Sequence, residues 1–254
     1  MKKVNLFFLN FVLVVGVIML FSMPAVSSAS KMDDAKKLFE QRADPEKAKQ
    51  GIELLQKIVE KKPKNMAAYE MLSRLTIYLA MDLAAKPDTE AESYEYLGLA
   101  GEITDAFMKL APKSVEANFW KAYSAAVAKD IKTALSYGEA AYKIDKKYFG
   151  GMPALLLGYL KGLLPPFMGG DKVAAYKFID EAMEAAPDNL MIHRIKAMLL
   201  VGDVKESAQK ALVHLQFVLE SEPSKGFEPE GKRDKVVAQQ LMGAYGEALK
   251  ALGK

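Results

Sequence analysis

The sequence has 254 residues and no cysteine, and this absence removes several kinds of chemistry. Disulfides, thiolate metal sites, cysteine nucleophiles and a lipid-bearing cysteine near the N-terminus are excluded. Histidine is scarce too: His193 and His214 stand alone, with no His-x-x-x-His or carboxylate-rich metal spacing. The Gly-x-Ser-x-Gly motif, the phosphate-binding loop and the dinucleotide fingerprint are all missing. We therefore expect a protein that is not an enzyme and needs no metal or cofactor.

A strong charge of one sign is also missing. The formal net charge is +3, and two of those charges, Lys2 and Lys3, belong to a segment that we expect to be removed. The remainder of 3 − 2 = +1 is small and evenly spread along the chain. It gives no basis for a nucleic-acid partner.

The first 29 residues have the pattern of an export signal. After the two lysines, Phe11 to Phe21 is an apolar run of signal-peptide length, Pro24 breaks the helix, and Ser27-Ser28-Ala29 offers small residues for cleavage. We expect cleavage near Ala29 and export to the bacterial periplasm, where a cysteine-free fold does not depend on disulfides.

The alternative is an uncleaved anchor in the inner membrane. Residues 4–23 are long enough to cross a bilayer, although Asn5 and Asn10 weaken this interpretation.

From Lys31 onward, Ala, Leu, Lys, Glu and Met dominate, and alternating β-branched patterns are rare. This composition predicts helices almost throughout. Three frames share one spacing of small residues followed by a terminator: Ala134-Ala141-Lys146, Ala175-Ala182-Pro187 and Ala211-Val218-Pro223. Small residues allow two helices to cross closely, so the frames predict stacked antiparallel helix pairs.

We accordingly expect one all-α solenoid domain over residues 30–254, with its best repeats in 114–223 and a capping helix at about 233–252. Capping residues and prolines divide the rest of the chain. The expected helices run from Asp44 towards Pro63 and over 65–84, 90–110, 114–128, 131–145, 153–163, 172–186, 190–200 and 205–221. Residues 223–231 are expected to form a linker.

The frames resemble the tetratricopeptide repeat family. Trp120 and Tyr123 lie near that family's aromatic positions, Ala122 and Ala197 fill its small position, and Lys146 replaces the usual proline. The resemblance implies degenerate helix pairs that bind other molecules on a concave face.

A narrower resemblance concerns Tyr148-Phe149-Gly150-Gly151 and Pro165-Pro166-Phe167-Met168-Gly169-Gly170-Asp171, followed by a helix ending at Pro187. This segment is similar to the T-component family of tripartite ATP-independent periplasmic (TRAP) transporters, best over 114–187. The resemblance implies an exported helical-repeat protein that associates with the transporter's solute-binding protein. Some members carry a lipid-anchored cysteine, which this sequence lacks.

The most unusual segment is Met152 to Met168, which is apolar around most of a helix. Such a helix is either buried between its neighbours or forms the wall of an apolar pocket. In the second case Leu155, Tyr159 and Phe167 would contact the ligand.

An aromatic group on an earlier helix gives a second candidate surface. Phe119, Trp120 and Tyr123 fit either the core or the concave face of the solenoid, and Phe149 joins them as a candidate contact.

The paired glycines have simpler interpretations. Gly150 and Gly151 predict a turn before Pro153. Gly169, Gly170 and Asp171 form either an anion-binding nest or, as we favour, a turn with Asp171 as helix cap.

Three functions remain open at this point. The protein is an adaptor for a periplasmic solute-binding protein, a general scaffold for envelope components, or a carrier of an apolar small molecule.

Overall fold

The computed structural model describes residues 28–200 and 205–251, so the expected export signal and the alternative anchor lie almost wholly outside the described residues. The helices are α2 Ser28–Glu40, α3 Pro45–Lys61, α4 Met66–Ala84, α5 Glu90–Leu110, α6 Val115–Val127, α7 Ile131–Ile144, α8 Tyr148–Leu163, α9 Lys172–Ala185, α10 Leu190–Leu200, α11 Lys205–Glu220 and α12 Glu228–Ala251. Short 3₁₀ helices occur at Pro87–Thr89 (η1) and Pro166–Met168 (η2). Within the described ranges, no helix is both long enough and apolar enough to cross a membrane.

Helix starts coincide with side chains that cap them. Asp44, Asn65, Ser114, Asp130 and Asp171 each precede a helix and accept a hydrogen bond from a backbone N–H of its first turn. These N–H groups have no partner inside the helix, so a cap at each position fixes where the helix begins. Local sequence therefore sets where these five helices begin.

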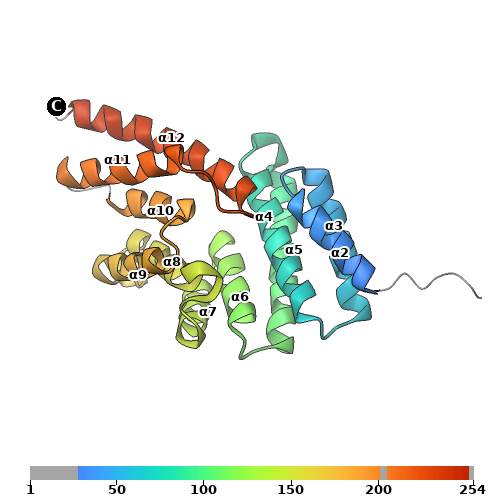
Figure 1. Cartoon of the computed structure of the whole chain (residues 1–254). Coiled ribbons are helices and arrows are strands. Elements are labelled where there is room, and N and C mark those ends of the chain that lie inside the picture. Colours follow the sequence, from blue (N-terminus) through green and yellow to red (C-terminus); the bar gives the residue numbers. More distant parts are fainter. Residues whose placement is uncertain (1–27, 201–204, 252–254) are drawn as a thin grey trace, which may run out of the picture.

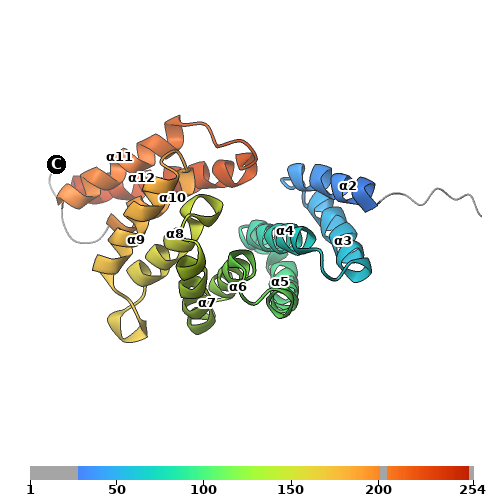
Figure 2. The same ribbon diagram turned by 60° about the horizontal axis from the view of Figure 1, so that its bottom comes forward.

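The helices stack as antiparallel pairs in chain order: α4 with α5, α6 with α7, α8 with α9, and α10 with α11 (Figures 1 and 2). The first helices of successive pairs also contact one another, α4 with α6, α6 with α8, and α8 with α10. The small residues of the three frames are buried at the crossings, as expected. The fold is an all-α helical-repeat solenoid, which confirms the predicted class.

Helices α8 and α9 approach each other closely where they cross. A Cβ added at Gly158 would lie 2.7 Å from Ile179 Cδ1 and 3.1 Å from the Ala175 carbonyl oxygen. Both distances are shorter than ordinary contacts, so this crossing depends on glycine.

The apolar segment after residue 151 forms the centre of this core. Leu155, Leu156, Leu157 and Leu160 are buried, and most of them belong to the central hydrophobic cluster. The helix begins with a kink, because Phe149, Gly150 and Gly151 all have positive φ angles. The glycine pair is thus the turn that the sequence predicts.

The last helix, α12, differs from its prediction. It begins at Glu228, inside the expected 223–231 linker, rather than near Arg233. Pro229 fits the first turn of a helix, and Glu228 and Glu230 place negative charge at its positive end. The expected end at residue 252 lies outside the described residues.

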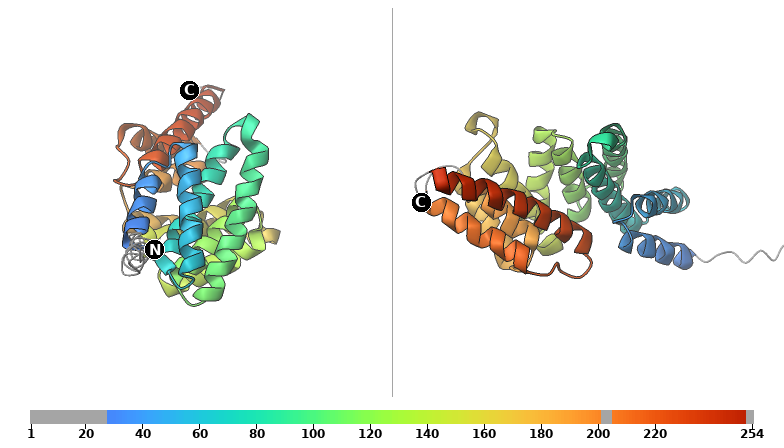
Figure 3. Two further views of the ribbon diagram at one scale, coloured as in Figure 1. Left: turned by 90° about the vertical axis from the view of Figure 1, so that its right-hand side faces the viewer. Right: turned by 90° about the horizontal axis from the view of Figure 1, so that it is seen from above.

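This earlier start carries α12 across the solenoid. The helix packs on α10 and α11, and its N-terminal end is turned towards α4 (Figures 1 and 3). Arg42 Nε donates a 3.2 Å hydrogen bond to Glu230 Oε1, and Arg42 Nη2 donates one of 2.6 Å to the Gly226 carbonyl. Residues more than 180 positions apart are thereby joined across the inside of the stack.

Candidate ligand-binding cavity

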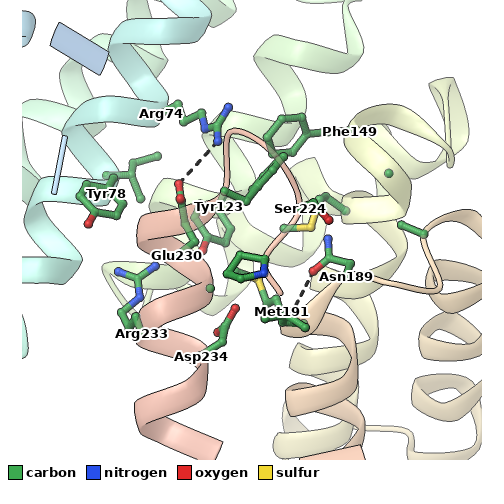
Figure 4. Close-up of a pocket in the computed structure, with 18 of the residues that line it drawn as sticks. Arg74, Tyr78, Tyr123, Phe149, Asn189, Met191, Ser224, Glu230, Arg233 and Asp234 are labelled. Carbon is green, nitrogen blue, oxygen red and sulfur yellow. Dashed lines mark hydrogen bonds and ion pairs between the residues drawn. The ribbon is translucent and has the colours of Figure 1, made fainter. Parts of the chain in front are cut away.

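A cavity of about 460 Å³ lies between the inner helices and the start of α12 (Figure 4). Its walls come from α4, α6, the start of α8, the turn from α9 to α10, and the loop that leads into α12. The apolar lining includes Ile77, Tyr78, Met81, Phe119, Trp120, Tyr123, Phe149, Met152, Ala186, Pro187, Leu190, Met191, Pro223 and Phe227. The charged lining consists of Arg74, Asp188, Glu230, Arg233 and Asp234.

One wall is an aromatic cluster whose members hold each other in place. The Trp120 ring meets Phe119 edge-on at 4.9 Å and Phe149 at 5.8 Å between centroids. Trp120 Nε1 donates a 3.1 Å hydrogen bond to Tyr148 Oη, which itself donates to Glu70 Oε1 at 2.5 Å. The only indole in the sequence is therefore fixed in orientation by partners outside the cavity.

Tyr123 adds a phenol that faces the same space. Its hydroxyl lies 3.7 Å from Met81 Sδ, a weak acceptor. Burial raises the pKa of Tyr123, so the phenol is neutral and remains a hydrogen-bond donor.

Arg74 lies next to this cluster in an aromatic cage. The guanidinium carbon lies 4.6 Å from the Phe39 ring, 4.9 Å from Phe149 and 4.7 Å from Phe227. Arg74 Nη2 also lies 3.5 Å from Glu230 Oε1. Burial lowers the pKa of Arg74, and the charge of Glu230 opposes that effect. The guanidinium stays charged and its orientation is fixed.

The N-terminal part of α12 contributes two further charges, those of Arg233 and Asp234. Arg194 Nε donates a 2.7 Å hydrogen bond to Asp234 Oδ1. Burial raises the pKa of Asp234, while the Arg194 charge counteracts it. Arg233, one residue earlier, lies over the Tyr78 ring at 5.5 Å.

A histidine pair supports the turn between α9 and α10. His193 Nδ1 and His214 Nδ1 are 3.0 Å apart, and His193 Nε2 lies 2.8 Å from the Pro187 carbonyl oxygen, which only accepts. His193 therefore donates from Nε2, and His214 donates to His193 Nδ1. Burial lowers the pKa of both rings. Nowhere in the described part of the chain do three or more histidines and carboxylates gather as metal ligands.

The candidate residues fall into two sets. Phe119, Trp120, Tyr123, Phe149 and Gly150 line the cavity. The other candidates lie elsewhere. Leu155 is buried in the core, Tyr159 packs against that core, and Phe167 is 87% exposed on η2.

The remaining turn residues act on the backbone. Gly151 and Gly169 have positive φ angles of 81° and 92°. A Cβ at Gly170 would collide with the Leu164 carbonyl oxygen. Asp171 Oδ1 accepts from the Ala174 amide at 3.0 Å, so this carboxylate is a helix cap and not part of an anion-binding nest.

Sequence reasoning missed the charged half of the cavity. Arg74, Glu230 and Arg233 come from helices far apart in the chain, and no motif links them. The only local signal was the acidic Glu228-Pro229-Glu230 helix start, because it shows that α12 begins early enough to reach α4.

Comparisons with known proteins complete this description. No protein-family model matches the sequence, and no curated protein matches it. A crystal structure of MamA protein matches with a TM-score of 0.47 and 15% identity over 83% of this chain and 95% of that one. A crystal structure of the APC/C hetero-tetramer Cut9-Hcn1 matches with a TM-score of 0.46 and 17% identity. That match covers 91% of this chain but only 47% of the other.

Proposed function

We propose that this protein is a non-catalytic binding protein that holds a small, mainly apolar molecule in the cavity between α4, α6, α10 and α12. The observation that carries the proposal is the cavity itself, with its volume of about 460 Å³ and its aromatic wall. Sites for small organic ligands commonly span roughly 300–1,000 Å³, with apolar walls and a few oriented polar groups.

The side chains of the wall favour recognition without large rearrangement. Trp120 is fixed through Tyr148, and Arg74 is fixed by three rings and by Glu230. Groups that are already ordered lose little conformational entropy when a ligand binds. The ordered side chains of Trp120 and Arg74 therefore suit binding of a ligand.

The proposed setting is the periplasm, next to a TRAP transporter. The sequence pattern of residues 1–29 supports export. The segment that is similar to the T-component family also contributes Phe149 and Gly150 to the cavity. In this setting the protein would hold a solute that a periplasmic solute-binding protein delivers or receives.

Native mass spectrometry of the mature chain, purified gently from its native envelope, tests the binding function. We expect a bound molecule in the wild type. Met191→Trp should displace it, because Met191 lines the cavity and tryptophan fills space there. Val213→Trp, on an exposed position of α11, is the matched control and should retain the ligand. An empty wild-type protein would contradict the proposal.

A second candidate, docking of a solute-binding protein, is favoured by an apolar patch at the α8–α9 connection. Phe167 is 87% exposed and Val173 is 83% exposed, with Leu163 and Met168 beside them in sequence and also exposed. Patches of this kind mark interaction sites on soluble proteins.

Co-purification with the tagged wild type and a Phe167→Ser variant distinguishes this role. We expect the wild type to retain a solute-binding protein and the variant to lose it with an unchanged helical signal. Equal capture by both would remove the patch from consideration. Recovery of other envelope proteins alone would favour the general scaffold.

A further inference from the structure

One donor at the cavity has no partner. Among the described side chains, Arg233 Nη1 is a buried nitrogen without a hydrogen bond, and it belongs to a residue that lines the cavity. A buried charged donor without a partner is costly, and such a group in a native protein calls for an occupant that the protein alone does not supply.

The nearby carboxylates are already engaged. Glu230 binds Arg42 and lies 3.5 Å from Arg74, and Asp234 accepts a 2.7 Å hydrogen bond from Arg194. Neither carboxylate accepts a hydrogen bond from Arg233 Nη1, although both lie on the same helix as Arg233. Asp188 also lines the cavity but is exposed at its edge, where solvent screens its charge.

The charges around the cavity favour a monovalent over a divalent anion. The lining carries two guanidinium groups (Arg74 and Arg233) and three carboxylates (Asp188, Glu230 and Asp234), and Arg42 and Arg194 pair with Glu230 and Asp234 from outside the lining. A ligand with a single carboxylate adds one negative charge beside Glu230 and Asp234, whereas a phosphate dianion adds two.

We propose that the cavity's ligand is a small monocarboxylic acid, with its carboxylate on Arg233 and its apolar or aromatic body against Trp120, Tyr123 and Phe149. This inference rests on the proposed binding function and names the class of ligand. A guanidinium suits a carboxylate because its planar donors match the two oxygens. The aromatic wall offers the body a surface of ordered rings.

Trp120 provides the readout, because it is the only tryptophan in the sequence and lines the cavity. Its emission would be followed during titration with 4-phenylbutyrate and with the neutral 4-phenylbutyramide, and octanoate with octanamide would form a second pair. Calorimetry would measure the same affinities. We expect each acid to bind at least tenfold more tightly than its amide, since a charge-assisted hydrogen bond contributes roughly twice as much as a neutral one.

The Arg233→Met variant separates the carboxylate contact from general binding. It should reduce the acid-to-amide ratio to about one while amide affinity stays unchanged, which also shows that the variant is folded. Lys232→Met removes the same charge from an exposed neighbouring position and should keep the wild-type ratio. Arg233→Lys should restore part of the preference, since lysine keeps the charge but loses the planar donor pair.

The other outcomes overturn the inference in distinct ways. Equal binding of acid and amide by the wild type would leave the binding function intact but would show that the protein does not recognise the carboxylate. An unchanged acid-to-amide affinity ratio in Arg233→Met would show that Arg233 does not contact the carboxylate. Binding of N-acetyl-Leu-Phe but of neither acid would assign the site to a peptide terminus. No binding of any of these compounds, together with an empty protein from the native envelope, would reject both the inference and the proposed function.

Discussion

Replacing Arg42 by methionine tests the contact that closes the solenoid. The Arg42 side chain is 1% exposed and the Glu230 side chain 12%. The substitution keeps an apolar stem of similar length but removes the hydrogen bonds to Glu230, to the Phe39 carbonyl at 3.0 Å and to the Gly226 carbonyl at 2.6 Å. Breaking a buried ion pair commonly costs about 3–5 kcal/mol. Arg74 still lies 3.5 Å from Glu230, so we expect a loss near the lower end, about 3 kcal/mol.

Urea unfolding followed by circular dichroism and by Trp120 emission would measure this loss. With a slope of about 1–3 kcal/mol per molar urea, the midpoint should fall by roughly 1–3 M. The two signals should coincide in the wild type. In the variant we expect the α2–α3 end, far from Trp120 in sequence, to unfold first, because helical repeats otherwise contact only their neighbours.

Two comparisons make the result decisive. Arg42→Met combined with Glu230→Leu should lose less stability than Arg42→Met alone, since it leaves no buried carboxylate with a missing partner. Lys36→Met, at an exposed position of α2, should change stability by less than about 0.5 kcal/mol. A loss under about 1 kcal/mol for Arg42→Met would show that the contact does not hold the ends together.

Three further predictions concern single elements. Gly158→Val should lower the free energy of unfolding by about 1–3 kcal/mol through overpacking, as measured by urea unfolding. Gly98→Val is the control, because an added Cβ at Gly98 meets open space. Equal losses of stability in the two variants would refute the packing argument. Asp171→Ala should cost about 1 kcal/mol through the lost cap, with asparagine at the same site retaining most of the stability; an unchanged melting midpoint would contradict this. Burial, then the charge of His193, lower the pKa of His214 from 6.5 to about 4, and burial also lowers the pKa of His193. Between pH 4 and pH 6.5 the unfolded chain therefore binds more protons than the folded chain. The stability is retained above pH 6.5 and falls as the pH is lowered towards 4. His214→Phe should flatten this dependence in melting curves recorded at a series of pH values.

The local elements could be predicted because their causes lie within a few residues. The cap at Asp44, the proline at position 45 and the terminator at Pro63 define α3 without reference to any distant group. The small residues of the three frames likewise identified the helix crossings, because only a small side chain permits a close approach.

The aromatic half of the cavity could be predicted in part. Phe119, Trp120 and Tyr123 occupy one face of α6, and helical periodicity alone places them together. Periodicity could not decide whether Leu155 or Phe149 faces the same space. The positive φ angles at Phe149, Gly150 and Gly151 direct that ring towards Trp120, while Leu155 continues into the core.

The sequence by itself determined the helices, their order and the all-α repeat class, since capping, periodicity and small residues act over short separations. Only the tertiary structure decided the cavity and its charge. The early start of α12 brings Glu230 and Arg233 to helix α4, and Arg42 holds them there across more than 180 residues. A contact between such distant residues depends on the summed packing angles of every repeat between them, and no local pattern specifies that sum.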